Sequence, residues 1–377
     1  MADSRDIVVV GGGALGMLSA RCLAEAGRRV TLVERDRVGR GTSRAGGGIM
    51  SPLAPWNVPE AVARLAECSL PLLPGLAEAL AKDTGINPEY RVTGVIHIDC
   101  EELEPALAFA QRAGMRTELL DEAALAALAP AAVRTPGPSL LFPDLAQIRN
   151  PRFLDALAAD LERRGVTLLE DAGEVTLERS GGGIRVNAGT HGRLRAANVV
   201  VAAGAWSAGL VAPLGVRLPV TPIRGQVLWY MLPRPMLHHV LIRHGRYVIP
   251  RQEGVVLVGS TVEDVGFDTS TTAAAADELR AAAAEMVPLL GTLAVQGQWA
   301  GLRPGSPDGI PMIGPVPGVT GLWVNTGHFR NGVNLAPASA ALLAALMTGA
   351  TPPLDPAPYD PGARMAQSTS AAYNPTL

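Results

Sequence analysis

The sequence of 377 residues predicts an α/β protein made of two interleaved domains, and three observations carry this prediction. A β-branched strand over Ile7–Val10 leads directly into the glycine-rich turn Gly11–Gly16, and a helix and a second strand ending at Glu34 are expected to follow. A buried strand of the same kind recurs over Asn198–Ala203. The stretch from Pro222 to Gly259 instead indicates several short strands separated by turn residues. Because a glycine-rich loop and a helix return after this stretch, we expect domains whose chains interleave.

The opening strand–turn–helix unit has the features of a Rossmann-like, dinucleotide-binding fold. In such units the first glycine, here Gly11, makes the tight turn, and the second, Gly13, lets the backbone approach a pyrophosphate. The third, Gly16, allows the helix to pack closely on the strand. The free N–H groups at the start of the helix favour the anion, and Glu34 is placed to accept hydrogen bonds from a ribose.

Further elements are expected from hydrophobic periodicity and from turn residues. Asn150 and Pro151 are interpreted as the N-cap and the first position of a helix over Arg152–Arg164. The other expected elements are a helix over Ala14–Ala26, a strand over Val30–Val33, a β-hairpin of Val175–Leu177 and Ile184–Val186, a helix over Ala273–Met286 and a last helix over Ala336–Met347. The segment after Thr351 is rich in Pro, Ser and Thr, so a poorly ordered tail is expected.

The composition excludes several classes of protein. The 32 Lys and Arg against 35 Asp and Glu give a net charge of −3, so the chain lacks the basic surface by which proteins bind nucleic acid. The three cysteines form no CxxC pair, and His238, His239 and His244 do not have metal-ligand spacing, so neither disulfides nor a metal site is expected. The first residues do not resemble a signal peptide, and charges, Pro or Gly interrupt every long apolar run. A cytoplasmic protein without a membrane span is expected.

A second glycine-rich loop favours a flavin over a nicotinamide cofactor. The glycine fingerprint alone fits both NAD and FAD. The loop Gly41–Ile49 follows the expected ribose position and exposes its backbone. A nicotinamide enzyme has no general need for such a loop, whereas a longer flavin cofactor that reaches toward a second domain does need one. An NAD-dependent dehydrogenase stays open as an alternative, which a colourless purified protein would favour.

Several motifs together resemble one family. They are IVVVGGGALG and VTLVER near the start, GTSRAGGGI at 41–49, VVVAAGAWS at 199–207, GLRPGSPDGIPMIG at 301–314 and GHFRNGVNLAP at 327–337. In this order and spacing they resemble the D-amino-acid oxidase–like FAD-dependent oxidoreductases, and among these the glycine oxidases associated with thiazole (thiamine) biosynthesis. The expected architecture is thus a Rossmann-like FAD-binding domain interleaved with a β-rich α+β substrate domain. The expected FAD-binding segments are 1–85, 145–220 and 298–355, the substrate-binding segments are 86–144 and 221–297, and 356–377 is the poorly ordered tail.

The resemblance implies a set of flavin contacts, position by position. The implied residues are Gly11, Gly13, Ala14, Leu15 and Gly16 at the pyrophosphate, Glu34 and Arg35 at the ribose, Thr42, Ser43, Gly47, Gly48 and Ile49 along the middle of the cofactor, Val175 at the adenine, and His328, Phe329, Arg330, Asn331, Gly332, Val333 and Asn334 around the isoalloxazine. Covalent attachment in this family uses a late Cys or an early His. No Cys follows Cys100 and no His precedes His97, so non-covalent FAD is expected.

The resemblance also implies that the catalytic residues are Arg303, Tyr247 and Arg330. Arg303 is expected to hold a substrate carboxylate as a bidentate fork, with Tyr247 on the second oxygen. For Arg330, contact with substrate and a role in shaping the flavin loop both stay open. Val262 stands where some glycine oxidases carry a Met that lines the substrate pocket, so the size of the accepted amine also stays open.

The implied reaction is oxidative deamination of glycine, sarcosine or small D-amino acids. A hydride leaves Cα for flavin N5, the imine hydrolyses, and O2 reoxidises the flavin with release of hydrogen peroxide. An amino-acid dehydrogenase for L-proline or a D-amino acid, which passes electrons to a quinone or carrier, is the alternative. A flavin-containing tRNA-modifying protein is disfavoured by the net charge. A homo-oligomer stays open.

Overall fold

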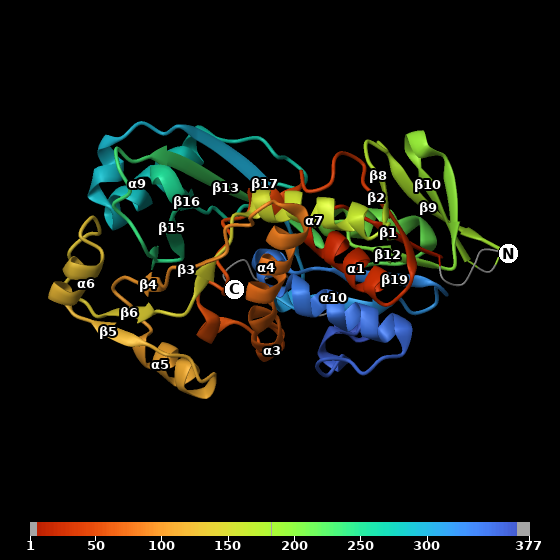
Figure 1. Cartoon of the computed structure of the whole chain (residues 1–377), viewed down its shortest axis with the longest axis horizontal. Helices are drawn as coiled ribbons and strands as arrows, with labels where there is room; N and C mark the ends of the chain where they lie inside the picture. The colour runs from red at the N-terminus through yellow and green to blue at the C-terminus, as the bar shows by residue number, and fades with distance from the viewer. Residues whose placement is uncertain (1–5, 182, 368–377) are drawn as a thin grey trace.

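The computed structural model describes residues 6–181 and 183–367, which are arranged around two large sheets that meet in the middle of the molecule (Figure 1). The strands of the six-stranded sheet, in order of neighbours, are β18 (Met312–Pro315), β19 (Leu322–Thr326), β12 (Asn198–Val201), β1 (Asp6–Val10), β2 (Arg29–Val33) and β8 (Thr167–Leu169). Neighbouring strands are parallel except for β18 and β19. Parallel strands that begin with a βαβ unit are the arrangement expected of a Rossmann-like domain.

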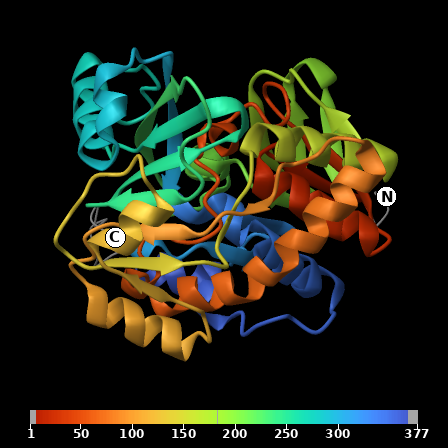
Figure 2. The ribbon, with the colours of Figure 1, turned by 60° about the vertical axis from the view of Figure 1, so that its left-hand side comes forward.

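The eight-stranded sheet contains the β-rich segments. Its strands, in order of neighbours, are β17 (Gly297–Gly305), β13 (Thr221–Met231), β16 (Val255–Gly259), β15 (Arg246–Pro250), β14 (Val240–Arg243), β4 (Val95–His97), β6 (Ser139–Phe142) and β5 (Glu118–Leu120). Neighbours are antiparallel except for β14 and β4. In Figure 2 the red, yellow-green and blue parts of the chain lie together in one half, and the gold and cyan parts lie in the other half. The fold class predicted from the sequence is confirmed.

The central strand β1 is buried on both faces, which explains its unbroken apolar run. Ile7 and Val9 pack on one face in a core with the helices α1 (Ala14–Glu25), α7 (Asn150–Arg163) and α10 (Gly332–Thr348). Val8 and Val10 pack on the other face against a three-stranded antiparallel sheet of β9 (Val175–Ser180), β10 (Gly183–Ala188) and β11 (Arg193–Ala196). The hairpin expected between residues 175 and 186 is therefore present, and it covers the face of the sheet opposite the helices.

The eight-stranded sheet also separates its two faces by alternation. Val248 of β15 packs in a core with Leu279 and Met286 of α9 (Ala273–Met286). Tyr247 and Ile249, its neighbours in the strand, point to the opposite face and another core. Ile49 and Leu53, which follow the second glycine-rich loop, pack against this second core. The alternation thus turns Tyr247 toward the region where the two halves meet.

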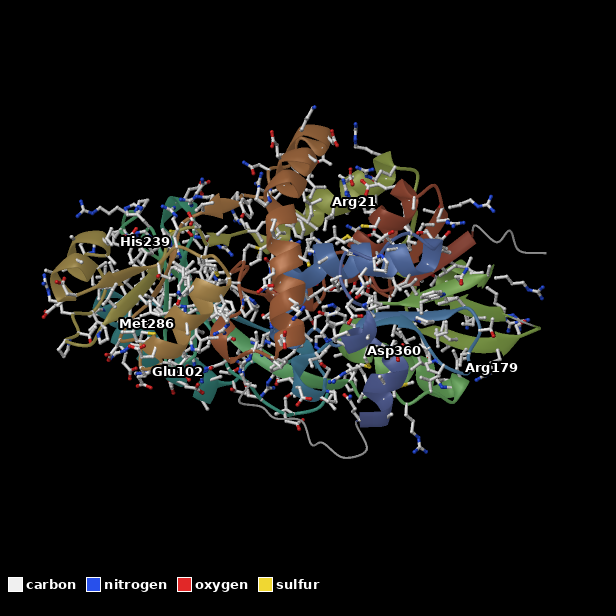
Figure 3. All side chains as sticks on the ribbon, turned by 90° about the horizontal axis from the view of Figure 1, so that it is seen from below. Arg21, Glu102, Arg179, His239, Met286 and Asp360 are labelled. Atoms are coloured by element: carbon white, nitrogen blue, oxygen red, sulfur yellow. The ribbon has the colours of Figure 1, made fainter. Side chains whose placement is uncertain are left out.

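Side chains fill both halves of the molecule up to this junction. Seen from below, the labelled Glu102, His239 and Met286 lie in the half with the eight-stranded sheet (Figure 3). Arg21 and Arg179 lie in the other half (Figure 3).

Among the described residues one helical stretch, Phe329–Thr348, is long and apolar enough to cross a membrane, and 61% of its apolar 18-residue segment is buried inside the molecule. Packing against α1 and α3 (Glu60–Ser69) accounts for this apolar surface, because α10 is a helix of the core.

Two helix boundaries differ from the sequence-based expectation. Helix α7 begins at Asn150 and its N-cap is Arg149, so the interpretation of Asn150 as the cap is wrong by one position. The Asn150 amide instead donates to the carbonyl oxygens of Ser43 and Gly46, at 2.8 and 3.0 Å. Helix α10 begins at Gly332, four residues before the expected start, with Pro337 inside it. A proline usually lies in the first turn, which is why the pattern placed this start too late.

The expected poor order of the tail is wrong for residues 357–367. These residues form η10 (Ala357–Tyr359) and α11 (Pro361–Gln367). The Tyr359 hydroxyl donates to the Ala61 carbonyl at 2.6 Å, and the buried Arg364 donates to the Pro307 carbonyl at 2.6 Å. Composition missed both anchors because each depends on a partner far away in the sequence. Residues 368–377 of the expected tail lie outside the described residues.

Candidate functional site

A cavity of about 600 Å³ lies between the two sheets. This volume is in the range of cofactor and small-molecule sites. Its wall takes in residues of β1, β2, the start of α1, α2 (Thr42–Ala45), β13, β15, β17 and the start of α10. All of the implied flavin contacts, together with Arg303, Tyr247 and Arg330, line this cavity except Ala14 and Gly16. Residues that are up to about 320 positions apart in the sequence are therefore brought to one place.

Ala14 and Gly16 lie behind the wall and shape it through the backbone. A Cβ on Gly16 would lie 1.8 Å from the Gly11 carbonyl oxygen, so α1 approaches β1 closely enough to require a glycine here. The N–H of Ala14 donates to the Ser43 hydroxyl at 3.1 Å. The two glycine-rich loops are thus joined to each other at the start of the helix.

Two helix N-termini open on the cavity. Helix α1 follows Gly13 and helix α10 follows Asn331, and both of these residues line the cavity. Neither helix has a side-chain cap, and neither carries an acidic residue in its first turn. Free backbone N–H groups and the helix dipole make such ends favourable places for negative charge.

Two glycines of the loops lie where no side chain fits. Gly11 has a φ of +113°, and a Cβ there would lie 2.5 Å from the Ala202 carbonyl oxygen. Gly48 has a φ of +72°, and a Cβ would lie 2.1 Å from the Ile148 carbonyl oxygen. Both positions therefore require glycine on conformational and on steric grounds.

Glu34 and Arg35, the residues expected at the ribose, both line the cavity. The Glu34 carboxylate accepts hydrogen bonds from the backbone N–H groups of Gly12 and Asp36, at 2.6 and 3.1 Å. A carboxylate has about four acceptor positions, so it can still accept a ribose hydroxyl. The guanidinium of Arg35 stacks on Trp206, 3.8 Å from the ring centroid. Trp206 also lines the cavity, and the sequence assigned it no role.

Near the start of α10, two buried polar atoms have no hydrogen-bond partner among the described residues. His328 shares a hydrogen bond between Nε2 and the Ser339 hydroxyl at 2.9 Å, which leaves Nδ1 without a partner. Asn334 Oδ1 is also buried and also lacks a hydrogen-bond partner among the described residues. Burial lowers the pKa of His328 to about 3, so its ring is neutral at physiological pH. Buried polar atoms of this kind normally have a partner, which points to a ligand with polar groups.

The expected substrate residues come from two strands and a turn. Arg303 lies on β17 and Tyr247 on β15. The Arg303 guanidinium donates to the Ser260 hydroxyl at 2.6 Å and to the Thr261 carbonyl at 3.1 Å. Burial raises the pKa of Tyr247, although the nearby charge of Arg303 partly opposes this. Tyr247 is therefore a neutral phenol that can donate a hydrogen bond.

Arg330 and Asp308 complete the neighbourhood. Arg330 lines the cavity from η9 (Phe329–Asn331), and its guanidinium carbon lies 5.2 Å from the Phe329 ring centroid. Asp308, the nearest acidic neighbour of Arg303 in the sequence, forms an ion pair with Arg364 at 3.8 Å. Val262 is not among the residues that line this cavity.

Sequence reasoning missed several residues that build the site. Gly225 and Ser260 line the cavity beside Arg303. Arg251 lies behind the wall, 9% exposed, and donates to the carbonyl of Gly47 and to the side chain of Gln147, both at 2.6 Å. Burial lowers the pKa of Arg251 to about 10. The available signal was its position four residues after Tyr247 in the strand motif RYVIPR.

His239 and His244 each lie close to an oxygen atom of another residue. His239 Nδ1 lies 2.6 Å from the Thr93 carbonyl oxygen, and His244 lies 3.4 Å from a Glu101 carboxylate oxygen. Within the part of the chain that the structure describes, no group of three or more His, Cys, Asp or Glu side chains is arranged to hold a metal ion.

Comparisons with known proteins agree with this geometry. The model of the family described as FAD dependent oxidoreductase matches residues 6–346. The chain is 45% identical to a glycine oxidase of Pseudomonas aeruginosa over 96% of this chain and 100% of the relative. It is 32% identical to the bifunctional protein ThiO/ThiG of Trichormus variabilis over 90% of this chain and 52% of that protein. The crystal structure of glycine oxidase from Geobacillus kaustophilus superposes with a TM-score of 0.89 at 30% identity, covering 94% of this chain and 98% of that one.

Proposed function

The chain belongs to the family of FAD-dependent oxidoreductases, and on that premise we propose that it oxidises glycine or another small amino acid at the cavity between the two sheets. The observation that carries this proposal is the meeting of an arginine fork and a neutral phenol at a cavity whose glycine loops and helix N-termini suit a dinucleotide. Sarcosine and small D-amino acids belong to the same substrate class. The likeness of this chain to a glycine oxidase over nearly its whole length supports glycine as the first substrate to test.

The residues present fit FAD. Gly11, Gly13 and the start of α1 suit the pyrophosphate, with Glu34 and Arg35 at the ribose. The unpartnered Nδ1 of His328 and Oδ1 of Asn334 suit the polar edge of a flavin ring. When bound, FAD supplies the two-electron acceptor for oxidation of the substrate. No cysteine is among the cavity-lining residues, which supports non-covalent binding.

Arg303 and Tyr247 have separate roles in this proposal. The Arg303 guanidinium binds the substrate carboxylate through two parallel N–H groups, and its seat on Ser260 and Thr261 sets the direction of the fork. The neutral Tyr247 hydroxyl donates to the second carboxylate oxygen. Together they fix Cα in one orientation, and positioning of this kind contributes several kcal/mol to a reaction (roughly 7–11 in the most favourable cases). Arg330 adds positive charge to the same cavity.

Arg303→Ala is the test of this assignment. We expect the flavin absorption spectrum to stay intact and the KM for glycine to rise steeply, because loss of a bidentate charged contact costs about 2–5 kcal/mol. Oxygen consumption and hydrogen peroxide release are measured with glycine, sarcosine and D-alanine. Arg246→Ala is a matched control, because Arg246 pairs with Glu278 on the outside of the same sheet. An unchanged KM in Arg303→Ala would remove Arg303 from the site.

We propose O2 as the electron acceptor, and the experiment that separates it from the alternative is kinetic. Rapid anaerobic reduction by the amino acid followed by rapid reoxidation in air supports the oxidase. Rapid reduction with slow reoxidation favours the dehydrogenase that passes electrons to a quinone or carrier.

The three cysteines are free in the structure, which supports a reducing, cytoplasmic location. Likeness to ThiO/ThiG supports a place in thiamine biosynthesis.

The domain limits belong to the proposal as well. The FAD-binding segments 1–85 and 145–220 contain four of the six strands of the six-stranded sheet. The limit at residue 298 falls inside β17, which pairs with β13 from Thr221 to Trp229. We therefore propose that the substrate-binding part extends through Gly305.

A further inference from the structure

We infer that Glu263 is a positioning residue for Arg303, which it acts on through Thr261 and through its ion pair with Arg224. The inference rests on the proposed role of Arg303 in binding the substrate carboxylate. Glu263 does not line the cavity, so any effect on the substrate passes through other residues.

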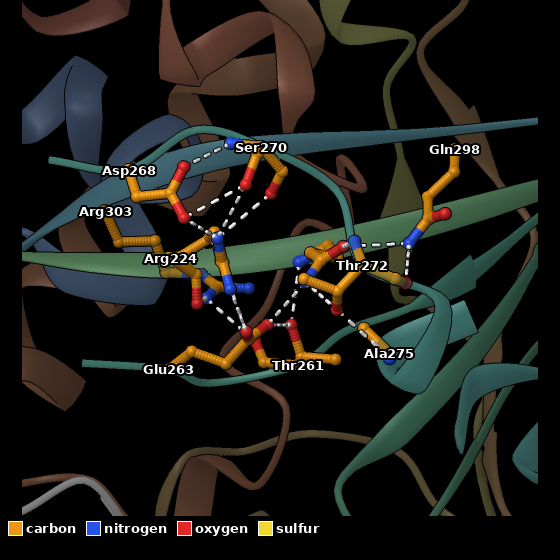
Figure 4. Close-up of polar contacts among 10 residues, drawn as sticks. Arg224, Thr261, Glu263, Asp268, Ser270, Thr272, Ala275, Gln298 and Arg303 are labelled. Carbon is orange, nitrogen blue, oxygen red and sulfur yellow. Dashed lines mark hydrogen bonds and ion pairs between the residues drawn. The ribbon is translucent and has the colours of Figure 1, made fainter. Parts of the chain in front are cut away.

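The Arg303 guanidinium lies in a fitted seat. Its floor is Gly225, where a Cβ would lie 2.1 Å from Nη2 and 2.2 Å from Nη1 of Arg303. Its side is formed by the Ser260 hydroxyl at 2.6 Å, the Thr261 carbonyl at 3.1 Å and the Arg224 carbonyl at 3.4 Å. Arg303, Thr261 and Arg224 are labelled in Figure 4. The direction of the fork therefore depends on where the chain at 260–261 lies relative to β13.

Glu263 holds that segment against β13. Its backbone forms two hydrogen bonds with Arg224, at 2.9 and 3.0 Å. The Thr261 hydroxyl donates to Oε1 of Glu263 and accepts from the Gln226 N–H at 2.9 Å. Oε1 also accepts from the Gln226 side-chain amide at 2.9 Å. One carboxylate oxygen thus ties the residue whose carbonyl contacts Arg303 to the neighbouring strand.

The second oxygen of Glu263 is bound to a buried charge. Oε2 accepts from Nη2 of Arg224 at 2.6 Å, and Arg224 is 3% exposed. Arg224 also donates to Asp268 at 2.7 Å (Figure 4). Burial acts to raise the pKa of Glu263, but hydrogen bonds from Thr261, Arg224 and Gln226 outweigh it, so the carboxyl is ionised at neutral pH. A buried arginine needs such a partner, which keeps Glu263 in one place.

A carboxylate ligand that cannot be oxidised tests this inference without turnover. The holoenzyme is titrated with acetate, and the dissociation constant is read from the perturbation of the visible flavin spectrum. Glu263→Gln keeps the size of the side chain and removes its charge. We expect the acetate Kd to rise about 3- to 10-fold, because the hydrogen bonds that set the fork are misaligned. With glycine, we expect the rise to appear in KM and the change in kcat to stay below about twofold.

A matched control and a double variant separate positioning from a general loss of structure. Glu278→Gln removes the carboxylate partner of Arg246 on the outside of the same sheet and should leave the acetate Kd unchanged. In the Arg303→Lys background there is no fork to orient. Glu263→Gln should therefore raise the acetate Kd by less than about twofold there, as expected for coupled residues. An equal rise in both backgrounds would overturn the inference.

The outcomes also separate this inference from the proposed function. If Arg303→Lys alone leaves the acetate Kd unchanged, Arg303 does not bind the carboxylate and the proposed role fails. If Arg303→Lys weakens acetate binding but Glu263→Gln does not, the positioning role alone is overturned. If Glu263→Gln does not retain FAD, Thr261→Val replaces it, because that variant removes the hydroxyl and keeps the carbonyl. Thr261→Val should give the same 3- to 10-fold rise in Kd, and no rise would again overturn the inference.

Discussion

The phenol of Tyr247 is closely packed and buried. Gly47 and Gly259 lie against it, since a Cβ on either would come within 3.1 Å of the hydroxyl oxygen. Burial raises its pKa above the usual value near 10, with Arg303 opposing the shift. A group whose pKa is raised in this way stays protonated, and therefore remains a donor, throughout the neutral and mildly alkaline range.

Tyr247→Phe should raise the KM for glycine about 2- to 10-fold, the cost of about 0.5–1.5 kcal/mol for one hydrogen bond. Because the phenol does not ionise below pH 10, the variant should keep the shape of the wild-type pH profile. The measurement is kcat/KM from pH 7 to pH 10 for both proteins. An alkaline limb that is present in the wild type and absent from Tyr247→Phe would mean that the phenol titrates in this range and that its assigned state is wrong.

Single residues also show where sequence reasoning succeeds and where it stops. Gly11 and Glu34 could be placed because their roles depend on neighbours within one βαβ unit. Gly225 and Ser260 could not, because their contacts with Arg303 join residues that are 43 to 78 positions apart in the chain. Trp206 lies in a motif that was recognised, but its stacking on Arg35 requires the packing of two separate segments.

At the scale of an element, the packing of α1 on β1 depends on Gly16. A Cβ at Gly16 would lie 1.8 Å from the Gly11 carbonyl oxygen. Because this oxygen belongs to the backbone, no change of side-chain rotamer relieves the clash. Gly16→Ala should therefore lower the free energy of unfolding by roughly 1–3 kcal/mol and reduce the bound FAD. Thermal melting and the ratio of flavin to protein absorbance measure both effects.

Gly75 provides the matched control for this prediction. It lies in α4 (Leu73–Thr84), and nothing lies within 4 Å of its would-be Cβ. Gly75→Ala should stabilise the protein by about 0.5–1 kcal/mol, because alanine favours a helix over glycine. If both variants behaved alike, the close approach of α1 and β1 would not be the feature that requires glycine at position 16.

Strand β4 carries a buried histidine whose titration predicts acid sensitivity. His97 packs among Trp56 and Phe142, with ring centroids 4.8 and 5.7 Å away, and burial lowers its pKa from 6.5 to about 4. Between these values the unfolded chain binds the proton and the folded chain does not. The stabilisation is therefore present above pH 6.5 and is lost as the pH falls toward 4.

His97→Phe should make the protein less sensitive to acid. Lowering the pH from 7.5 to 5 should cost the wild type about 2 kcal/mol through this residue, and the variant should lack that part of the loss. Urea unfolding at the two pH values measures the difference. His328 acts in the same direction, so some dependence remains in the variant. If the free energy of unfolding fell equally with pH in the two proteins, His97 would have to be protonated in the folded state.

Element boundaries were predictable where local chemistry sets them. Helix α9 spans the residues expected, because its alanine-rich run begins after the capping residue Thr272. Asn150 has the residue type of a cap but serves the loop at 43–46 instead. That role depends on a segment 104 to 107 residues away, so nothing local distinguished it from a cap.

For the whole molecule, hydrogen bonds join α2 to β17 beside the cavity, because Thr42, Ala45 and Gly301 all line it. The Thr42 hydroxyl donates to the Leu302 carbonyl at 2.8 Å, and the Trp299 indole donates to the Ala45 carbonyl at 3.0 Å. Both bonds tie α2 to β17. Interleaved domains were predictable from the order of the motifs along the chain. The placement of α2 against β17 involves these long-range bonds, so sequence patterns did not contain it.

Since residues of both sheets line one cavity, a bound cofactor should stabilise the whole fold, and a non-covalent one should do so reversibly. Acid precipitation should leave the yellow colour in the supernatant. The apoprotein should melt at a lower temperature, and FAD at 100 times its Kd should restore about 2.7 kcal/mol of stability. NAD at the same concentration is the control and should have no effect. Colour that stays with the precipitate would contradict non-covalent binding. If FAD did not change the melting temperature, the cofactor would not bridge the two halves of the molecule.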